Sequence, residues 1–236
     1  MRPIASELTL RILVAKVACR IATEQWIDKL KPRQLGVGVK GGAEALAHGA
    51  RRFLDNMPAD NLFIKIDFSN AFNTLRRDSI RETIEQQIPG LLGYFDSAYG
   101  QSTHLQYGDF TIESAEGIQQ GETLDPFLFC LTIHPLLSGI HSNFVSGYLD
   151  DIALGGEAAV AISDIQRLEL AAKTLGLSLN YNKCEVIGLS NLTRSLWDSA
   201  ELYFTETPLN RCYISWNLNP NRFRGGQCIG EANCRP

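Results

Sequence analysis

The sequence predicts a globular α+β fold around one buried core, and three observations support this prediction. Of its 236 residues, 44% are hydrophobic, which is enough to bury a sizeable core, and the length allows one or two domains. Short segments that alternate like strands are interleaved with longer segments of helical period. Two pairs of strand-like segments are joined by short turns, as in antiparallel hairpins.

The first sixty residues predict two helices and a glycine-rich loop. Apolar residues recur at helical spacing over residues 8–21, with charged residues on the other faces. Pro32 ends this region, residues 36–42 form a loop, and residues 43–57 predict a second helix. The loop does not match a phosphate-binding P-loop, because Lys40 is followed by glycine instead of serine or threonine.

The rest of the chain predicts strands that end at acidic residues. Residues 62–68 alternate as a strand that ends in a carboxylate, and helical segments follow it. Residues 104–113 predict one hairpin, and residues 144–154 predict a second, which has Asp150 and Asp151 at its turn. The remaining predicted elements are helices from about residue 121 and over residues 158–175, and a strand over residues 183–189. No clear period continues after residue 190.

The charge is distributed unevenly along the chain. The net charge of −4 argues mildly against a nucleic-acid partner, because phosphate binding usually leaves a basic footprint. However, residues 1–81 hold 14 Lys or Arg against 8 Asp or Glu, whereas residues 82–190 hold 3 against 14. This gradient suits a protein that grips phosphates with one part and gathers metal-binding carboxylates in another. The alternative is a chance distribution.

Cysteine spacing and the longest uncharged stretch argue against three further classes of protein. The six cysteines show no CxxC spacing and no signal peptide precedes them, so we expect neither a zinc site nor a secreted disulfide framework. The uncharged stretch of residues 126–149 is interrupted by Pro135 and two histidines, which favours buried core over a membrane span. We therefore expect an intracellular protein without a membrane partner, and these patterns do not distinguish a nuclear from a cytoplasmic one.

The carboxylates at the predicted strand ends indicate metal chemistry. If the strand before Asp67 neighbours the hairpin of Asp150 and Asp151, the three acids converge and repel one another, and divalent cations normally neutralise such a cluster. Two Mg²⁺ ions about 3.5–4 Å apart can activate a hydroxyl and stabilise a leaving oxygen, in polymerases and in nucleases. An acidic pair at a turn, taken alone, is more often a solvated hairpin tip.

Four segments stand out in order along the chain: FIKIDFSNAFN (residues 63–73), GIQQG (117–121), YLDD (148–151) and LGLSLNYNK (175–183). Together they resemble the palm motifs of reverse transcriptases, particularly those of non-long-terminal-repeat (non-LTR) retrotransposons and group II introns. The resemblance implies a right-hand polymerase fold, with a palm built on a ferredoxin-like split βαβ antiparallel sheet that carries helices on one face. It divides the chain into partial fingers (1–60), palm (61–190) and a divergent tail (191–236).

The resemblance implies catalytic roles for four residues and a place beside the primer for a fifth. Asp67 and Asp150 would bind two Mg²⁺ or Mn²⁺ ions, and Asp151 would complete the acidic cluster. Tyr148 would flank the primer end, and its alternative is an ordinary strand aromatic. Lys183 would be a general acid for the pyrophosphate leaving group, and its alternative is a solvated surface lysine.

The resemblance also implies that four residues bind the incoming nucleotide. Arg2 would contact the triphosphate, a task suited to a planar guanidinium. Phe72 would stack under the sugar and exclude a 2′-hydroxyl, which favours deoxynucleotides, and its alternative is a core phenylalanine. Gln120 and Gly121 would lie against the nucleotide and the template, where glycine lets the backbone approach closely.

The chain departs from the family pattern in three places. Residues 122–126 read Glu-Thr-Leu-Asp-Pro where the family has Asp-Pro-Leu-Gly-Pro, so we expect a changed loop. Leu149 stands where alanine is commoner. The chain begins inside the fingers, and nothing after Ser190 resembles a thumb, so we expect an incomplete copy that is not processive alone.

The resemblance implies an RNA-directed DNA polymerase domain of a retroelement, a nucleotidyltransferase. It would extend a DNA primer on an RNA template with deoxynucleoside triphosphates. The alternative is a catalytically inactive remnant that at most binds RNA, consistent with the missing thumb and the acidic net charge. A metal-dependent phosphodiesterase is a third hypothesis, but the Gln-Gly and Tyr-Leu-Asp-Asp segments have no evident place in it.

Overall fold

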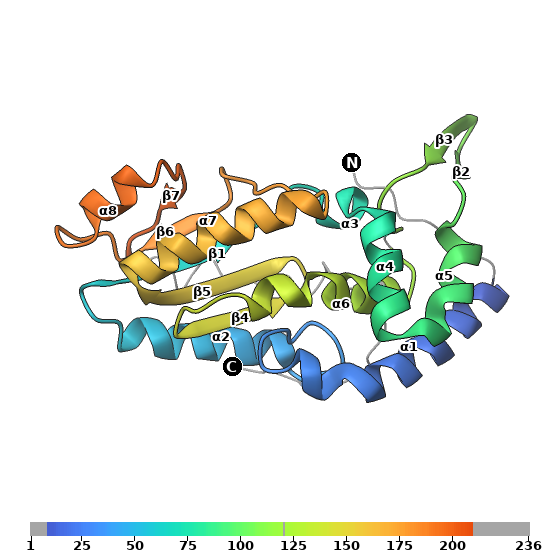
Figure 1. The fold of residues 1–236 in the computed structure, drawn as a ribbon, viewed down its shortest axis with the longest axis horizontal. Coiled ribbons are helices and arrows are strands. Elements are labelled where there is room, and N and C mark those ends of the chain that lie inside the picture. The colour runs from blue at the N-terminus through green and yellow to red at the C-terminus, as the bar shows by residue number, and fades with distance from the viewer. Residues whose placement is uncertain (1–8, 120, 210–236) are drawn as a thin grey trace, which may run out of the picture.

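The centre of the molecule is a five-stranded sheet (Figure 1). The computed structural model describes residues 9–119 and 121–209. In spatial order the strands are β4 (Phe144–Tyr148), β5 (Asp151–Glu157), β1 (Asn61–Ile66), β6 (Glu185–Ile187) and β7 (Thr205–Glu206). Neighbours are antiparallel except β6 and β7, which are parallel. With helices between β1 and β4 and between β5 and β6, this order is the predicted split βαβ arrangement, and the α+β fold is confirmed.

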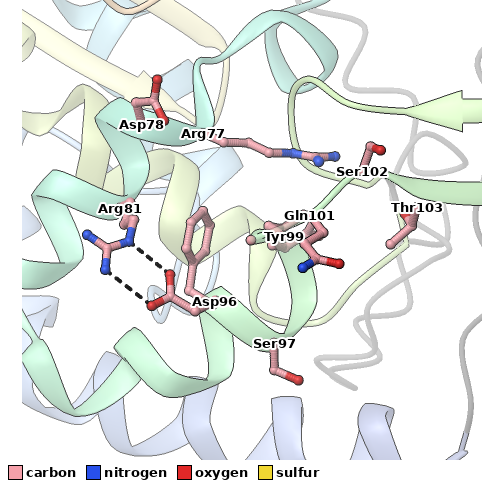
Figure 2. A pocket seen from close by; sticks show the side chains of 11 residues that line it. Arg77, Asp78, Arg81, Asp96, Ser97, Tyr99, Gln101, Ser102 and Thr103 are labelled. Carbon is pink, nitrogen blue, oxygen red and sulfur yellow. Dashed lines mark hydrogen bonds and ion pairs between the residues drawn. The ribbon is translucent and has the colours of Figure 1, made fainter.

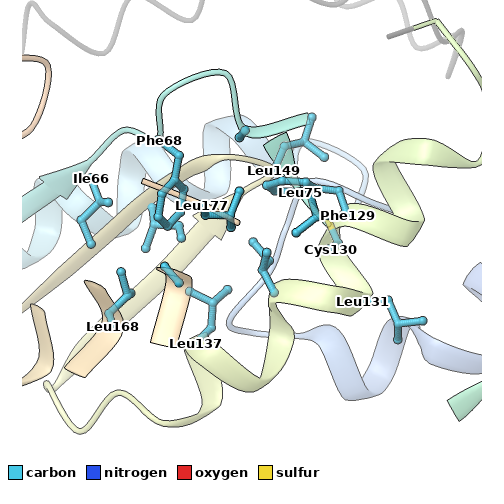
Figure 3. Close-up of a cluster of buried hydrophobic side chains, with 14 of the residues drawn as sticks. Ile66, Phe68, Leu75, Phe129, Cys130, Leu131, Leu137, Leu149, Leu168 and Leu177 are labelled. Atoms are coloured by element: carbon cyan, nitrogen blue, oxygen red, sulfur yellow. The ribbon is translucent and has the colours of Figure 1, made fainter. Parts of the chain in front are cut away.

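One face of the sheet is covered by two helices. They are α6 (Asp125–Ser138) and α7 (Ala158–Thr174). Ile64 and Ile66 of β1 are fully buried on this face, because alternate residues of a strand point to the same side. Figure 3 shows Ile66 in one cluster with Leu137 of α6 and Leu168 of α7. Burial of each such side chain stabilises the fold by about 1.5–3 kcal/mol.

The opposite face is covered by a helix from the N-terminal region, α2 (Gly42–Asp55). Leu54 of α2 packs with Phe63 of β1 in a second buried cluster. The rings of Phe53, Phe63 and Phe144 lie 5.6–5.8 Å apart between centroids. Strand β1 is therefore buried on both faces, which explains why its sequence is almost continuously apolar.

Helix α1 (Thr9–Leu30) runs for 22 residues, longer than the predicted helix over residues 8–21. It contacts α6 through a buried face that includes Ala15, Ala22 and Trp26. The helix continues past residue 21 because Trp26 and Leu30 keep the helical spacing of that buried face.

The chain between β1 and α6 forms short helices and a hairpin. These elements are α3 (Ala71–Thr74), α4 (Arg77–Gln87), the 3₁₀ helix η1 (Pro89–Leu91), α5 (Leu92–Tyr99), β2 (Thr103–Tyr107) and β3 (Phe110–Ser114). Strands β2 and β3 pair only with each other and project away from the main sheet (Figure 1). The hairpin predicted over residues 104–113 is confirmed.

Two small elements follow β6 where the sequence shows no clear period. Helix α8 (Arg194–Ser199) contacts α7, and β7 adds one edge strand to the sheet. The N–H of Thr205 donates to the carbonyl of Cys184 at 2.9 Å. Among residues 9–119 and 121–209, no helix is both long and apolar enough to cross a membrane.

Candidate functional site

Three aspartates lie at one end of the sheet. Asp67 follows β1, and Ile66 pairs with Ile152 of β5, so the register carried one residue further sets Asp67 beside Asp151. Asp150 lies in the two-residue turn between β4 and β5, where Tyr148 pairs with Asp151. We call Asp67, Asp150 and Asp151 the acidic edge.

Asp67 is held by the segment that follows α7. Its carbonyl accepts a hydrogen bond from the N–H of Asn180 at 2.8 Å, and its own N–H donates to Cys184 Sγ at 3.5 Å. Burial raises the pKa of the Cys184 thiol to about 11, so it stays protonated near neutral pH. The backbone of Asp67 is thus fixed by the motif of residues 175–183, which is distant in sequence.

The side chain of Asp67, unlike its backbone, has an oxygen that accepts no hydrogen bond from a described residue. The residue is only 8% exposed, and its Oδ1 atom has no hydrogen-bond partner within the described part of the chain. Lys183 Nζ lies 3.9 Å from this oxygen. A buried carboxylate oxygen that accepts no hydrogen bond is costly unless a cation approaches it.

The turn of the acidic edge rests on the core. Leu149 is buried and has a φ of 57°, in the left-handed region, while Asp150 and Asp151 are half-buried. Cys130 of α6 is fully buried, and its burial, together with the charge of Asp150, raises the pKa of its thiol. In the described residues as they stand, no three His, Cys, Asp or Glu side chains are gathered closely enough to hold a metal ion.

Phe72 lies at the margin of the core, five residues after Asp67. Its ring is half-buried and stacks on Phe129 of α6, with centroids 4.6 Å apart and an interplanar angle of 16°. It therefore has a fixed orientation and keeps part of its surface exposed. Tyr148 is also half-buried, at the end of β4.

The segment of residues 117–121 is attached to the segment of Phe72. Ile118 N–H donates to the carbonyl of Phe72 at 2.8 Å. Gly117 has a φ of 65°, and a Cβ atom there would lie 2.4 Å from the backbone of Asn73, so only glycine fits. Gly121 is exposed with a φ of 120°. Arg2 and Gln120 lie outside the described residues.

Comparison with known proteins identifies the family. A family model described as reverse transcriptase (RNA-dependent DNA polymerase) matches residues 1–204. The chain belongs to the reverse transcriptase family. The resemblance predicted from the four ordered segments is therefore confirmed.

Individual relatives agree with this family. Over 141 residues, the chain is 28% identical to the retrovirus-related Pol polyprotein from type-2 retrotransposable element R2DM of Drosophila melanogaster, covering 52% of this chain and 13% of that protein. Its fold is similar to that of apo telomerase from Candida tropicalis, with a TM-score of 0.56, 10% identity and coverage of 77% and 36% of the two chains. The telomerase of Candida albicans in complex with a TWJ fragment of telomeric RNA gives a TM-score of 0.50, 10% identity and coverage of 76% and 34%. The chain spans a minor part of each relative.

In this reverse transcriptase, the segment that departs from the family pattern is stabilised by buried polar contacts. Glu122 is 4% exposed and its Oε2 lies 3.5 Å from Nε of Arg11 in α1. Asp125 is 1% exposed, and its two oxygens share a hydrogen bond from the Tyr99 hydroxyl, which lies 2.9 Å from Oδ1 and 2.8 Å from Oδ2. The helix predicted from about residue 121 begins at Asp125, because Gly121 has a non-helical backbone.

A second arginine, Arg77, binds the backbone that leads into this segment, and the sequence did not predict this contact. Arg77 of α4 donates to the carbonyls of Gly117 at 2.7 Å and Ser114 at 3.0 Å, and its guanidinium lies 5.1 Å from the ring centroid of Tyr99. Burial lowers the pKa of Arg77. The sequence offered no signal for this contact beyond the basic pair of residues 76 and 77, which is typical of any solvated helix start.

A cavity of about 540 Å³ lies beside Arg77, between α4, α5 and the start of β2 (Figure 2). Figure 2 shows Arg81 paired with Asp96 along its wall, at 2.9 and 3.3 Å. Other polar residues of the lining are Asp78, Ser97, Gln101, Ser102 and Thr103. None of the acidic-edge aspartates lines this cavity.

Proposed function

We propose that this reverse transcriptase domain belongs to a retroelement and adds deoxynucleotides to the 3′-hydroxyl of a DNA primer paired with an RNA template. The acidic edge carries the proposal, because it combines three aspartates at one sheet end with a buried Asp67 oxygen that accepts no hydrogen bond from a described residue. A non-LTR element is favoured by the similarity to the R2DM polyprotein. An RNA partner is favoured by the telomeric RNA in the Candida albicans neighbour.

The donor chemistry of the acidic edge fits a hard divalent cation. Carboxylate oxygens are the ligands that Mg²⁺ and Mn²⁺ prefer, and Asp67, Asp150 and Asp151 would hold two such ions. When bound, the ions would activate the primer hydroxyl and stabilise the departing pyrophosphate oxygen.

Residues around the acidic edge would orient the nucleotide. Lys183 has its ammonium 3.9 Å from Asp67 Oδ1, and it would donate a proton to the leaving pyrophosphate. Phe72, fixed by Phe129, would form a rigid wall under the sugar. Gly121, with Gln120 and Arg2 assigned by resemblance, would contact the nucleotide from the other side. Tyr148 would flank the primer end.

Primer extension on a poly(rA)–oligo(dT) substrate, with Mg²⁺ or Mn²⁺, tests this proposal. The wild-type chain should extend the primer, and Asp150→Asn should lower the rate by about 1000-fold, because a metal site contributes several kcal/mol to the barrier. Glu157→Gln is the matched control, since Glu157 is an exposed carboxylate at the far end of β5. It should leave the rate unchanged.

The alternative function gives a different result in the same experiment. If the folded wild-type chain does not extend the primer but retains labelled RNA in a filter-binding assay, it is an inactive remnant that binds RNA. Equal rates for the wild-type chain and Asp150→Asn would show that any extension comes from another site or a contaminant.

A further inference from the structure

The segment before the glycine-rich loop lies along the hairpin that carries Asp150. Leu35 N–H donates to the carbonyl of Gly147 at 2.7 Å, and Gly147 N–H donates to the carbonyl of Arg33 at 2.8 Å, so residue 34 forms a parallel bridge with β4. Arg33 Nη1 also donates to the carbonyl of Leu137 at 2.6 Å, at the end of α6. This segment therefore joins the N-terminal region to the palm beside its catalytic turn.

The side chain of Gln34 makes its own contacts with that turn. Gln34 is fully buried, and its Oε1 accepts hydrogen bonds from the N–H of Leu149 at 2.9 Å and the N–H of Gly36 at 3.0 Å. Its Nε2 donates to the carbonyl of Leu149 at 3.1 Å. One side-chain amide thus satisfies both backbone polar groups of Leu149.

Leu149 depends on these contacts for two physical reasons. Its φ of 57° lies in the left-handed region, which is unfavourable for a residue with a Cβ. Its backbone groups are buried, and buried amides without partners are destabilising. The side chain cannot leave the core, where Figure 3 shows it beside Leu75 and Phe129. Without Gln34, the easiest relief would be a rotation of the turn.

Gly36 lies in the same contact. A Cβ atom at Gly36 would lie 2.6 Å from the backbone nitrogen of Leu149, too close for any other residue without a shift. The backbone of residues 34–36 therefore approaches the turn as closely as a glycine permits.

We propose that Gln34 is a positioning residue. It keeps Leu149 in the left-handed conformation and thereby orients the Asp150 carboxylate toward the other two aspartates of the acidic edge. The hydrogen bond to the Leu149 carbonyl fixes the plane of the peptide that leads into Asp150, so loss of that bond turns the carboxylate. Gln34 does not contact substrate. The inference rests on the proposed function only where activity is the readout.

The test replaces Gln34 with methionine, which has a similar volume and cannot donate to a carbonyl. Hydrogen exchange of the Leu149 amide, followed by NMR in the metal-free protein, should accelerate at least tenfold. The turnover rate kcat of primer extension should fall about tenfold while the KM for deoxynucleotide stays unchanged, because the nucleotide contacts are untouched. Leu54→Ala, in the cluster under α2, is the control for general destabilisation and should leave kcat per folded molecule unchanged.

Each outcome supports or overturns the positioning role. Unchanged exchange at Leu149, or faster exchange with unchanged kcat, would overturn it. If the wild-type chain has no polymerase activity, the proposed function is wrong, but the positioning role of Gln34 can still be tested. The affinity for Mn²⁺, measured by calorimetry, is then the readout. A tenfold weaker affinity in Gln34→Met would support the positioning role, whereas an equal affinity, or no binding by the wild-type chain, would overturn it.

Discussion

The acidic edge and the start of α6 each bury a carboxylate, Asp67 and Asp125, but the hydrogen bonding of the two differs. Asp67 is 8% exposed, and its Oδ1 accepts no hydrogen bond from a described residue. Asp125 is 1% exposed, and its two oxygens share one hydrogen bond from the Tyr99 hydroxyl. Glu122 is similarly buried, but its Oε2 accepts no hydrogen bond from a described residue and lies 3.5 Å from Nε of Arg11, so it resembles Asp67 more than Asp125.

This difference distinguishes a carboxylate that is available to bind a ligand from one that stabilises the fold. Burial disfavours a charged oxygen, and hydrogen bonds or opposite charges inside the protein offset that effect. Asp125 has such partners, so its contribution is structural. Asp67 Oδ1 accepts no hydrogen bond from a described residue and has only the half-exposed Lys183 ammonium 3.9 Å away, so its contribution to stability is small or unfavourable, and a bound cation would complete it.

The largest effect that tests this comparison is expected from Asp67→Asn. Primer extension should fall about 1000-fold, because a neutral amide is a poor metal ligand. The free energy of unfolding in urea should stay equal or rise, because the substitution removes a buried charge. A clear loss of stability would contradict the assignment of Asp67 as a residue held for a ligand.

The next effect is expected at Lys183, also at the acidic edge. Lys183→Met should lower kcat about 100-fold if the lysine is a general acid, and should leave stability almost unchanged, because its side chain is 51% exposed. Lys173→Met is the control, since that exposed lysine makes a similar ion pair with Glu169 on α7. Equal kcat values for both variants would favour the solvated surface lysine.

The parts of this molecule that the sequence predicts are those determined by local pattern. Both hairpins and β1 follow from alternation over a few residues, and the ordered motifs locate Asp67 beside the turn of Asp150. Strand β7 could not be predicted, because its two residues are strand only through their pairing with β6. The helix α6 was predicted to begin early because nothing local shows the backbone angle of Gly121.

The supporting contacts of the site could not be predicted for a different reason. Gln34 and Leu149 are 115 residues apart, and their contact depends on the fold of the whole palm. Arg77 reads as an ordinary charged residue near a helix start, yet it binds the carbonyls of Gly117 and Ser114. Such contacts leave no pattern in the sequence, because a backbone carbonyl or N–H group is present whatever the residue type of the partner.

A smaller effect is expected on the other side of the comparison, at Tyr99. Burial and the charge of Asp125 raise the pKa of Tyr99, so its hydroxyl remains a donor. Tyr99→Phe removes that donor and also the acceptor for Gln119 N–H, and should lower the free energy of unfolding by about 2 kcal/mol. Tyr203→Phe is the control, because Tyr203 is 79% exposed. Equal urea midpoints for both variants would show that Asp125 does not need this partner.

The smallest effect concerns pH and a fourth buried carboxylate, Asp164 of α7. Burial alone would raise the pKa of Asp164, but hydrogen bonds from Ser142 and from His141 N–H, with the charge of Arg167, lower it below its usual value. A carboxyl whose pKa is lower in the folded state stabilises the protein above its unfolded pKa, and this stability is lost as pH falls through the folded pKa.

The midpoint of thermal unfolding should therefore be lower for Asp164→Asn than for the wild-type chain at pH 6. This difference should shrink as the pH falls below about 4. If the difference in unfolding midpoint between the wild-type chain and Asp164→Asn stays constant with pH, Asp164 stabilises the fold by packing and neutral hydrogen bonds and not by its charge. In that case the contrast between hydrogen-bonded carboxylates and Asp67 would rest on Asp125 alone.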